Sequence, residues 1–346
     1  MLVNTTDNIT LNRLLTTVAR QNAADLHLTI GSPPVIRKDG ELFQLENEEI
    51  LTANFIERII ESVVNEATKT QLTNEGEVMF TETFNKVLRF RVHIYKQKGY
   101  FSVSFRYIPL SNKKITDLHL PGHLEKLACS KRGLIVITGI YDSGKSATLA
   151  AIINTINDVG PPRYITTLER PVEYLFVGNK CIIEQREVGR DVPSYIQGLK
   201  MVLNEDIDMV VVDRLSDQAV IKKFLEVVEA GRSAIVTLDA SSSINALSKL
   251  TSLSDPEENA WARKVISAHL LSIVTQKLLH RIGGGRVLAY EFLVNTGIIP
   301  SLLSSGNIER LSSVVKSFTE FDMTSLEASL ARLVQQGEIK LEEALI

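Results

Sequence analysis

Hydrophobic residues in the first third of the chain follow a helical period and then a strand period. Four of them recur near the start at three- and four-residue spacing, which predicts an amphipathic helix. These are Leu11, Leu14, Leu15 and Val18. A second helix is predicted over 53–64, and alternating hydrophobic and polar residues predict strands over 25–30, 77–84, 88–95 and 101–107. Helices mixed with antiparallel strands predict a small α+β domain over residues 1–108.

The pattern changes after a polar stretch at 109–122, which predicts a linker. From residue 123 onward, short hydrophobic runs alternate with helical patterns, as in parallel sheets covered by helices. The strands predicted there are 134–138, 164–168, 209–212 and 234–238. The tail from Ile298 is predicted to be helical, with turns at Gly306 and near Asp322. Residues 123–346 are therefore expected to form an α/β domain with a parallel sheet.

A glycine-rich motif follows the first of these buried strands. Residues 139–146 fit the G-x-x-x-x-G-K-S/T pattern of a P-loop, and a helical run follows at 147–157. In such loops backbone N–H groups surround phosphates, the lysine (here Lys145) neutralises them, and the hydroxyl of Ser146 holds Mg²⁺. The alternative is a plain glycine turn, but the flanking strand and helix favour a phosphate site. The expected binding residues are Gly139, Asp142, Ser143, Gly144, Lys145, Ser146 and Ala147.

Composition narrows the class of protein. The 346 residues carry a formal net charge of -3, with both signs mixed along the chain, so we expect no nucleic-acid partner. Cys129 and Cys181 are too few for a disulfide framework or a metal cluster and are expected to be core thiols. The histidines lack metal-ligand spacing. Because no signal-peptide pattern and no long apolar run is found, a cytoplasmic protein is expected.

Several short motifs lie in collinear order along the chain. They occupy residues 25–28, 31–34, 36–40, 89–92, 105–109 and 184–191. Together with the glycine-rich loop and the helical tail, they resemble PilT-like type IV pilus retraction ATPases of the type II/IV secretion ATPase superfamily. The resemblance covers essentially the whole chain, and its many separate motifs make it specific.

The resemblance implies a PAS-like N-terminal domain, a RecA-like C-terminal domain and a hexameric ring on the cytoplasmic side of the inner membrane. It implies ATP and Mg²⁺ as ligands and the inner-membrane pilus platform protein as a partner. Arg89, Arg91 and Arg106 match arginines that, in the family, reach towards a neighbour's nucleotide, and guanidinium groups suit phosphate. The alternative for Arg89 and Arg91 is that they solvate one face of a strand.

The polar positions of the active site depart from the family's pattern. The replaced positions are Ile140, Tyr141, Asp142 and Ala147 in the loop, Arg170 in the Asp box, Arg214 for the Walker B glutamate and Asp239 for the His-box histidine. Glu169 and Glu173 keep both carboxylates of the Asp box. The retraction-associated motif is reduced to residues 298–305. The framework of the family is therefore kept while its catalytic side chains have changed.

Arg214 is the replacement with the clearest chemical consequence. An arginine neither accepts a proton nor coordinates a cation, and losing a positioned acid–base group lowers a rate by about 10²–10⁴-fold. Asp213 either supports Mg²⁺ together with Ser146 or is an ordinary strand-end residue. Glu169 is the candidate general base, with an ion-pair role beside Arg170 as the alternative.

Asp142 places a carboxylate where phosphate is expected. At about 4 Å and an effective dielectric near 20, the repulsion between the two charges is about 4 kcal/mol. Because buried charges require partners, five residues are predicted to form ion pairs across the cleft. They are Asp142, Arg170, Asp213, Arg214 and Asp239. In the rival arrangement, the two arginines contact the phosphates directly.

These substitutions favour a cytoplasmic ring protein that binds nucleotide at best and hydrolyses ATP weakly or not at all. The alternative is an active hexameric ATPase that powers pilus retraction and twitching motility. The ring is either a homo-hexamer or a mixed ring with a paralogue that keeps the usual residues. Attachment to the pilus machine would place it peripherally at the inner membrane. Whether the chain is an enzyme stays open at this point.

Overall fold

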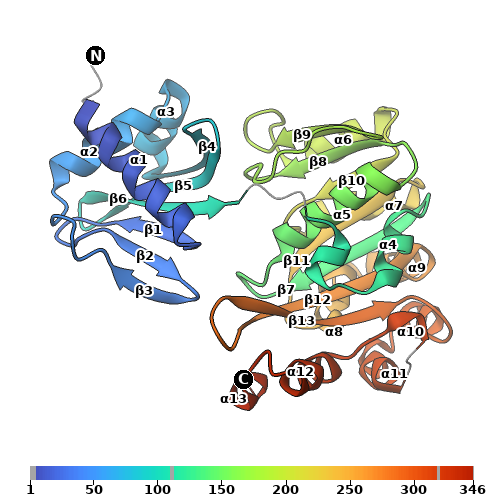
Figure 1. Cartoon of the computed structure of the whole chain (residues 1–346). Helices are drawn as coiled ribbons and strands as arrows, with labels where there is room; N and C mark the ends of the chain where they lie inside the picture. Colours follow the sequence, from blue (N-terminus) through green and yellow to red (C-terminus); the bar gives the residue numbers. More distant parts are fainter. Residues whose placement is uncertain (1–4, 110–112, 318–319, 346) are drawn as a thin grey trace. The chain divides into compact units, whose positions relative to one another are not determined.

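The computed structural model describes residues 5–109, 113–317 and 320–345. The chain divides into two compact units, Met1–Leu110 and Ser111–Ile346, each with its own hydrophobic core. Figure 1 shows a sheet with helices packed on it in each unit. Of the predicted linker, 109–122, residues 110–112 lie outside the described residues. The rest does not separate the units, because Ile115 and Leu120 are 0% and 6% exposed and belong to the second core.

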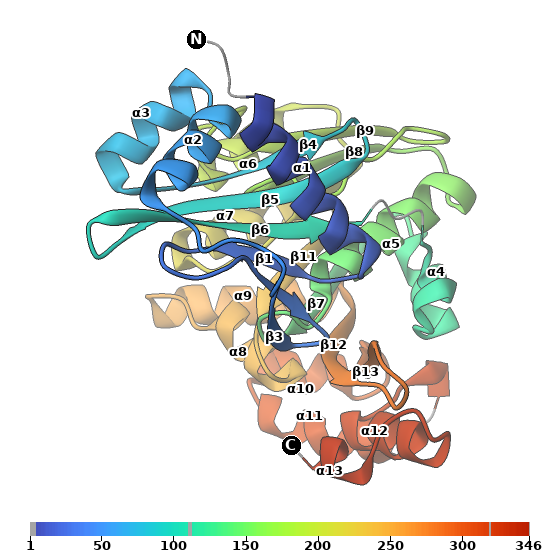
Figure 2. The same cartoon turned by 60° about the vertical axis from the view of Figure 1, so that its left-hand side comes forward.

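The first unit is a six-stranded antiparallel sheet in the order β3-β2-β1-β6-β5-β4, with α1 and α2 lying across it (Figure 2). Its elements are α1 (Thr5–Arg20), β1 (Asp25–Leu28), β2 (Val35–Lys38), β3 (Glu41–Gln44), α2 (Ala53–Val63), α3 (Glu66–Glu75), β4 (Glu77–Phe84), β5 (Leu88–Gln97) and β6 (Tyr100–Ile108). The four residues predicted to share a helical face are all buried on α1, where they pack with Phe90 and Phe105 of the sheet. The α+β prediction is confirmed.

Helix α3 has no counterpart in the hydrophobic pattern, because Leu72 is its only buried residue. Its ends hold it instead. Asn65 and Thr68 form a reciprocal capping box at its start, and left-handed Gly76 ends it. A helix fixed by its caps gives little periodic signal in the sequence.

The second unit is a seven-stranded sheet in the order β13-β12-β7-β11-β10-β8-β9, flanked by helices. Its first elements are η1 (Ile115–Leu118), α4 (Gly122–Ala128), β7 (Gly133–Gly139), α5 (Lys145–Val159), β8 (Tyr164–Glu169), β9 (Ile182–Glu187), α6 (Tyr195–Asn204), β10 (Met209–Val212), α7 (Gln218–Glu229) and β11 (Ser233–Asp239). They continue with α8 (Ser243–Thr251), α9 (Pro256–His269), β12 (Leu270–His280) and β13 (Arg286–Val294).

The sheet of the second unit is mixed, whereas a parallel sheet was predicted. Strands β7 to β12 pair in parallel, but β13 returns from β12 as an antiparallel hairpin and forms the edge. The tail beyond it is helical, as predicted, with α10 (Ile299–Ser305), η2 (Ile308–Arg310), α11 (Leu311–Ser317), η3 (Glu320–Asp322), α12 (Leu326–Gln335) and α13 (Leu341–Ala344). Gly306 ends α10 in the left-handed conformation.

Strand β9 forms the opposite edge of this sheet. After Ile182 and Ile183 it is wholly polar, with Glu184, Gln185 and Arg186 before its last glutamate. The guanidinium of Arg186 pairs with Glu184 at 2.9 Å and with Glu205 of the α6 C-cap at 2.8 Å. The exposed edge of the sheet therefore carries paired charges.

The core of the second unit brings the ends of its strands into line. All seven residues of β7 and all four of β10 are buried, as expected for parallel strands covered on both faces. In the ladder Gly139 lies opposite Asp239, and Val212 lies opposite Leu168. The carboxyl ends of β7, β8, β10 and β11 thus meet at one edge, where ligands bind in such sheets.

Both cysteines are free thiols in this unit. Cys181 is buried and Cys129 is half-buried. Burial raises the pKa of both thiols, which makes them poor nucleophiles.

Candidate nucleotide-binding site

The glycine-rich loop runs from the end of β7 into α5 and has tight backbone geometry. A Cβ added to Gly139 would lie 2.3 Å from Oγ of Ser143 and 2.6 Å from the carbonyl oxygen of Gln276, so no larger residue fits there. Gly144 has φ 89° and Asp142 has φ 61°, both left-handed. Asp142 therefore adopts a conformation that glycine takes most readily. The loop therefore has two left-handed positions, one of which is held by an aspartate.

The carboxylate of Asp142 is neutralised by a residue that the sequence did not indicate. Nη1 of Arg286, the first residue of β13, donates to Oδ2 of Asp142 at 2.7 Å. The prediction had paired Asp142 with Arg170 or Arg214. Those arginines follow β8 and β10, whereas Arg286 comes from the hairpin on the other side of β7.

Lys145 is bound within the loop and to Asp239. Its Nζ donates to the carbonyl oxygens of Gly139 at 2.9 Å and Ile140 at 2.7 Å, and pairs with Oδ1 of Asp239 at 2.9 Å. The ammonium group is therefore held by two hydrogen bonds and one ion pair. Asp239 reaches the lysine because β11 lies beside β7 and ends opposite Gly139. The carboxylate of Asp239 thus takes the place on Lys145 that a phosphate oxygen would take.

The predicted five-residue ion-pair network is wrong. Asp142 pairs with Arg286 instead, and Asp239 pairs with Lys145. Across the described ranges of the chain, the side chains of Arg170 and Arg214 form no ion pair, and both residues are exposed. An exposed arginine keeps its hydration and requires no buried partner, which is why the expected pairing was unnecessary.

The loop still has features that fit phosphate groups. Ser143 is 2% exposed, and its Oγ is buried without a hydrogen-bond partner. Such an orphaned hydroxyl fits an additional oxygen ligand. Ser146 and Ala147 follow in the first turn of α5, where N–H groups have no acceptor within the helix. The backbone of the loop therefore suits an anion, although Lys145 already forms an ion pair with Asp239.

Oxygen donors gather beside Ser146. A void of about 10 Å³, the size of one water molecule, is lined by residues that include Ser146, Glu169, Glu173 and Asp213. Hydroxyl and carboxylate oxygens suit Mg²⁺, which binds through one or two carboxylates plus phosphates and water. Within the described residues, no group of three or more His, Cys, Asp or Glu forms a metal site by itself. The donor set thus fits magnesium only as part of a nucleotide complex.

Asp213 is held in place by its neighbours on the sheet. Oγ1 of Thr237 donates to Oδ1 of Asp213 at 2.6 Å, and the Tyr195 hydroxyl donates to its carbonyl oxygen at 3.0 Å. Burial raises the pKa of the Asp213 carboxyl, which the Thr237 hydrogen bond partly opposes. The next residue, Arg214, turns outward with φ 58° while its backbone N–H donates to Thr237. Asp213 therefore faces the edge of the sheet, whereas the side chain of Arg214 is exposed and supplies no carboxylate there.

Glu169 is a buried acid of the site with a raised pKa. It is 6% exposed at the end of β8, accepts from Oγ1 of Thr167 at 2.6 Å and from Nε2 of Gln185 at 3.2 Å. Burial raises the pKa of its carboxyl to about 7, with the charges of Asp213 and Glu173 acting in the same direction. No ion pair with Arg170 is formed among the described residues. A carboxyl that titrates near neutrality is suited to proton transfer.

The three arginines expected at a neighbour's nucleotide lie in the first unit. Nε of Arg106 on β6 donates to Oδ1 of Asp25 at 2.8 Å, and Arg89 on β5 donates to Thr81 and Thr83. Arg89 and Arg91 alternate with buried Phe90 and so share one half-buried face, as the sequence indicated. Their role at a nucleotide stays a prediction.

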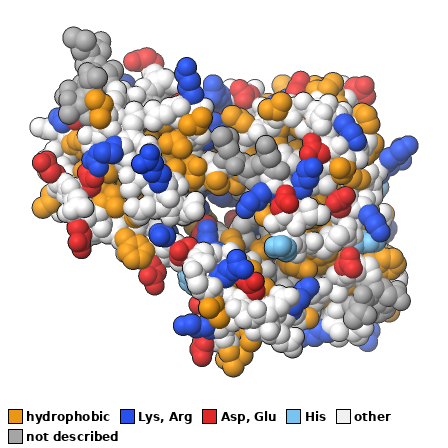
Figure 3. Space-filling view, viewed as in Figure 1, with side chains coloured by type: hydrophobic (Ala, Val, Ile, Leu, Met, Phe, Trp, Pro, Cys, Tyr) orange, Lys and Arg blue, Asp and Glu red, His pale blue; other side chains and the backbone are white. Residues whose placement is uncertain are grey.

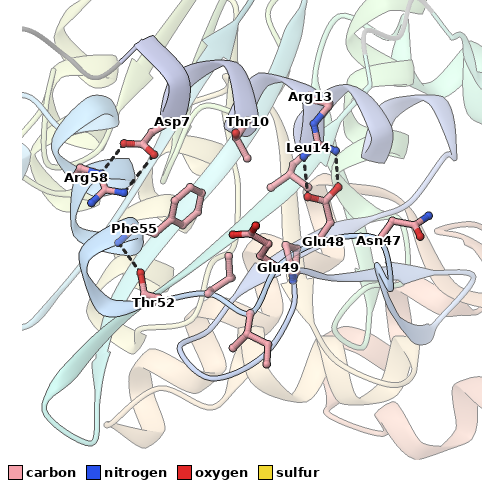
Figure 4. A pocket seen from close by; sticks show the side chains of 13 residues that line it. Asp7, Thr10, Arg13, Leu14, Asn47, Glu48, Glu49, Thr52, Phe55 and Arg58 are labelled. Atoms are coloured by element: carbon pink, nitrogen blue, oxygen red, sulfur yellow. Dashed lines mark hydrogen bonds and ion pairs between the residues drawn. The ribbon is translucent and has the colours of Figure 1, made fainter.

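A separate hollow of about 510 Å³ lies within the first unit, among α1, α2 and the segment before α2 (Figure 4). Two arginine–carboxylate pairs brace its ends: Arg58 with Asp7 at 2.6 Å and Arg13 with Glu48 at 2.7 Å. It contains none of the predicted site residues, and its walls come from three separate segments. Charge pairing over such separations leaves no local pattern in the sequence.

The surface agrees with the mixed charge of the sequence. On the face shown in Figure 3, acidic and basic side chains are interspersed. No helix in the described part of the chain is long and apolar enough to cross a bilayer.

Comparisons with known proteins agree with this geometry. The model of the family described as type II/IV secretion system protein matches residues 6–289. The type IV pilus retraction ATPase PilT of Pseudomonas aeruginosa is 31% identical over 96% of each chain. The type IV pilus ATPase PilU of the same species is 29% identical over 96% of this chain and 87% of its own. A crystal structure of the pilus retraction motor PilT with bound ADP superposes with a TM-score of 0.84, covering 96% of this chain and 95% of that one at 31% identity.

The family model matches most of the chain, and the relatives align with nearly all of it. The chain belongs to the type II/IV secretion system protein family and is homologous to the pilus ATPases PilT and PilU.

Proposed function

We propose that this chain is a cytoplasmic ring subunit of a type IV pilus or a related secretion machine, and that it binds nucleotide weakly and hydrolyses ATP slowly or not at all. The observation that carries the proposal is the state of Lys145. Its Nζ donates two hydrogen bonds to carbonyl oxygens of the loop and forms an ion pair with the carboxylate of Asp239. A nucleotide has to displace that carboxylate before its own phosphates reach the lysine.

The residues that would hold the nucleotide are those of the loop. Backbone N–H groups of residues 139–147 and the hydroxyl of Ser143 would receive phosphate oxygens, while Ser146 and Asp213 would hold Mg²⁺. When bound, the ion would neutralise phosphate charge. The relative with ADP bound has the same fold, which supports this placement.

Weak hydrolysis follows from the residues around that position. Arg214 has no acceptor atom with which to orient water. Glu169 is the candidate proton acceptor, because burial raises its pKa to about 7, which makes its carboxylate a stronger base while part of it stays deprotonated at neutral pH. Glu173 and Asp213 line the same void and add negative charge without replacing the lost acid at position 214.

An active retraction motor is the second candidate, and one observation favours it. The loop keeps its left-handed positions and its tight glycine in spite of the substitutions. If Asp239 leaves Lys145 readily, Glu169 and Asp213 supply the carboxylates for a reduced mechanism. On this reading the chain itself powers pilus retraction and twitching motility.

The ring is proposed as a hexamer, either of this chain alone or together with a paralogue, docked on the inner-membrane platform protein of the pilus machine. This assembly and the peripheral location at the inner membrane rest on the resemblance to pilus retraction ATPases, which the relatives PilT and PilU support. Light scattering tests the ring: a hexamer mass with Mg-ATP supports it, and a monomer at every concentration, with or without nucleotide, contradicts it.

A steady-state ATPase assay with Lys145→Ala as the control tests the chemistry. We expect turnover well below the range of about 1–100 s⁻¹ typical of phosphoryl-transfer enzymes. Turnover inside that range, abolished by Lys145→Ala, would establish the active motor instead.

A further inference from the structure

The β12–β13 hairpin runs directly along the nucleotide loop. Gln276 of β12 is the ladder partner of Gly139, and its Nε2 donates to Oγ1 of Thr148 in α5 at 2.7 Å. Two residues on, Cδ1 of Leu278 lies 3.1 Å from the position of a Cβ on Gly144. One strand therefore touches the loop at its first glycine and at its last.

Strand β13 also contacts the nucleotide loop, through an ion pair. Arg286 pairs with His280 in the ladder at the end of β12, and its guanidinium reaches Oδ2 of Asp142 at 2.7 Å. Side-chain exposures of 29% and 37% show that the pair is partly shielded from water. The turn of the hairpin is also fixed, because the N–H of Ile282 donates to the carbonyl oxygen of Glu338 at 2.8 Å. The arginine thus approaches the loop from a strand that is anchored at both ends.

The position of Asp142 makes this contact consequential. Its left-handed backbone (φ 61°) keeps the loop in shape, yet its carboxylate would repel any anion held by the neighbouring N–H groups. A cation bound to that carboxylate cancels the repulsion and fixes the direction in which the side chain turns.

We propose that Arg286 is a positioning residue of the nucleotide loop: it binds and neutralises Asp142, keeps the carboxylate turned away from the phosphates, and so makes the β12–β13 hairpin one wall of the site. This inference rests on the proposed binding of nucleotide at this loop. It assigns the phosphate site a residue that lies 144 positions from its partner in the sequence.

Hydrogen exchange without nucleotide tests the proposal independently of nucleotide binding. We expect Arg286→Gln to raise amide exchange across residues 139–147 by about fivefold, the equivalent of an ion pair worth about 1 kcal/mol. Arg281→Gln is the matched control, since it removes a cation of the same hairpin that pairs with Glu338 at 2.8 Å and not with the loop. Unchanged exchange in Arg286→Gln, or an equal rise in the control, would overturn the proposal.

A double-mutant cycle on Mg-ADP affinity supplies the second measurement. Arg286→Gln should weaken binding about fivefold, and Asp142→Asn in the same background should restore it, because the carboxylate that repels phosphate is then gone. A double variant as weak as Arg286→Gln would contradict the proposal. Arg286→Lys keeps the charge and should retain most of the affinity, which guards against a folding defect.

The two arms separate this inference from the function it rests on. If the unmodified protein binds no Mg-ADP, the proposed nucleotide function fails, while the exchange experiment still decides whether Arg286 holds the loop. If Mg-ADP binds but exchange does not respond to Arg286→Gln, the nucleotide function stands and this inference falls.

Discussion

The candidate site has two sides that differ in what they preserve. On the loop side, Gly139, left-handed Asp142 and Gly144 keep the backbone in a phosphate-binding shape. On the opposite side, at the ends of β10 and β11, Arg214 and Asp239 stand where the family's pattern has a glutamate and a histidine. The backbone geometry is thus kept in the loop, which joins strand β7 to helix α5.

This contrast shows how two kinds of constraint act on one site. A Cβ on Gly139 collides with the backbone of Gln276, so a change there disturbs the packing of the unit. Arg214 is exposed, and Asp239 has a side-chain exposure of 51%, so replacing either disturbs little besides chemistry. A site can therefore lose catalytic groups and keep its architecture.

The sharpest way to test the contrast is to restore the chemical side. Arg214→Glu combined with Asp239→His should raise ATP turnover by about 10²-fold or more, because a positioned acid–base group returns to an intact loop. Steady-state phosphate release measures it. Arg214→Gln with Asp239→His is the control that removes the cation without supplying an acid. An equal gain in this control would show that the arginine obstructs the site and that the acid is not needed.

Glu169 should make stability depend on pH. Its pKa in the folded protein is about 7, above the value of 4.5 for a free carboxyl, so the fold favours the protonated form. Its contribution is full below about pH 4.5 and is lost as the pH rises through 7. We expect the free energy of unfolding of Glu169→Gln at pH 8 to exceed that of the unmodified protein by up to about 3 kcal/mol.

Urea denaturation at pH 5 and pH 8 measures this difference. Glu184→Gln is a control of opposite sign, because a hydrogen bond from Tyr164 and the contact with Arg186 lower the pKa of that carboxyl. Equal pH slopes for Glu169→Gln and the unmodified protein would mean that Glu169 is not protonated preferentially in the fold.

Substitutions on the loop side should lower stability by disturbing the packing of the loop. Gly139→Ala forces a methyl group to within 2.6 Å of a backbone oxygen, and we expect it to lower the free energy of unfolding by about 1–3 kcal/mol. Gly122→Ala at the start of α4 meets no atom within 4 Å and should change it by less than about 0.5 kcal/mol. Similar effects of the two changes would remove the distinction between the two sides of the site.

The smallest expected effect concerns the contact between the two sides. Asp239→Ala removes the anion paired with Lys145 and should tighten Mg-ATP binding about fivefold, since a half-exposed ion pair is worth at most about 1 kcal/mol. Titration calorimetry at low and high salt measures the change, and the gain should shrink as salt screens the pair. Unaltered affinity at low salt would show that Asp239 does not compete with phosphate.

Local patterns accounted for much of the fold. Strand β10 was predicted with its observed ends, because four consecutive buried residues are typical of a parallel strand. Strand β9 was not predicted, since its polar residues become a strand only by pairing with β8. The antiparallel return of β13 was missed for a similar reason, as pairing direction is set by the hairpin and the neighbouring strand.

Some residues of the site could likewise be predicted from a local motif, whereas others are brought together only by the fold. Lys145 and Ser146 follow from a motif of eight consecutive residues, which sequence alone displays. Arg286 lies 144 positions from Asp142, and only the fold brings them together. The Lys145–Asp239 pair could have been inferred from the sequence, because Asp239 ends β11 and Lys145 follows the loop at the end of the neighbouring strand β7.

The polar edge strand β9 has a consequence for the protein at high concentration. An open strand is a template on which another chain can add a strand, and long apolar edges of this kind lead to aggregation. Here Glu184, Arg186 and Glu187 line that edge, with Arg186 already engaged by two carboxylates. A strand approaching from another copy would have to break these pairs and bury charge. The paired charges therefore disfavour the addition of an eighth strand from another copy to this seven-stranded sheet.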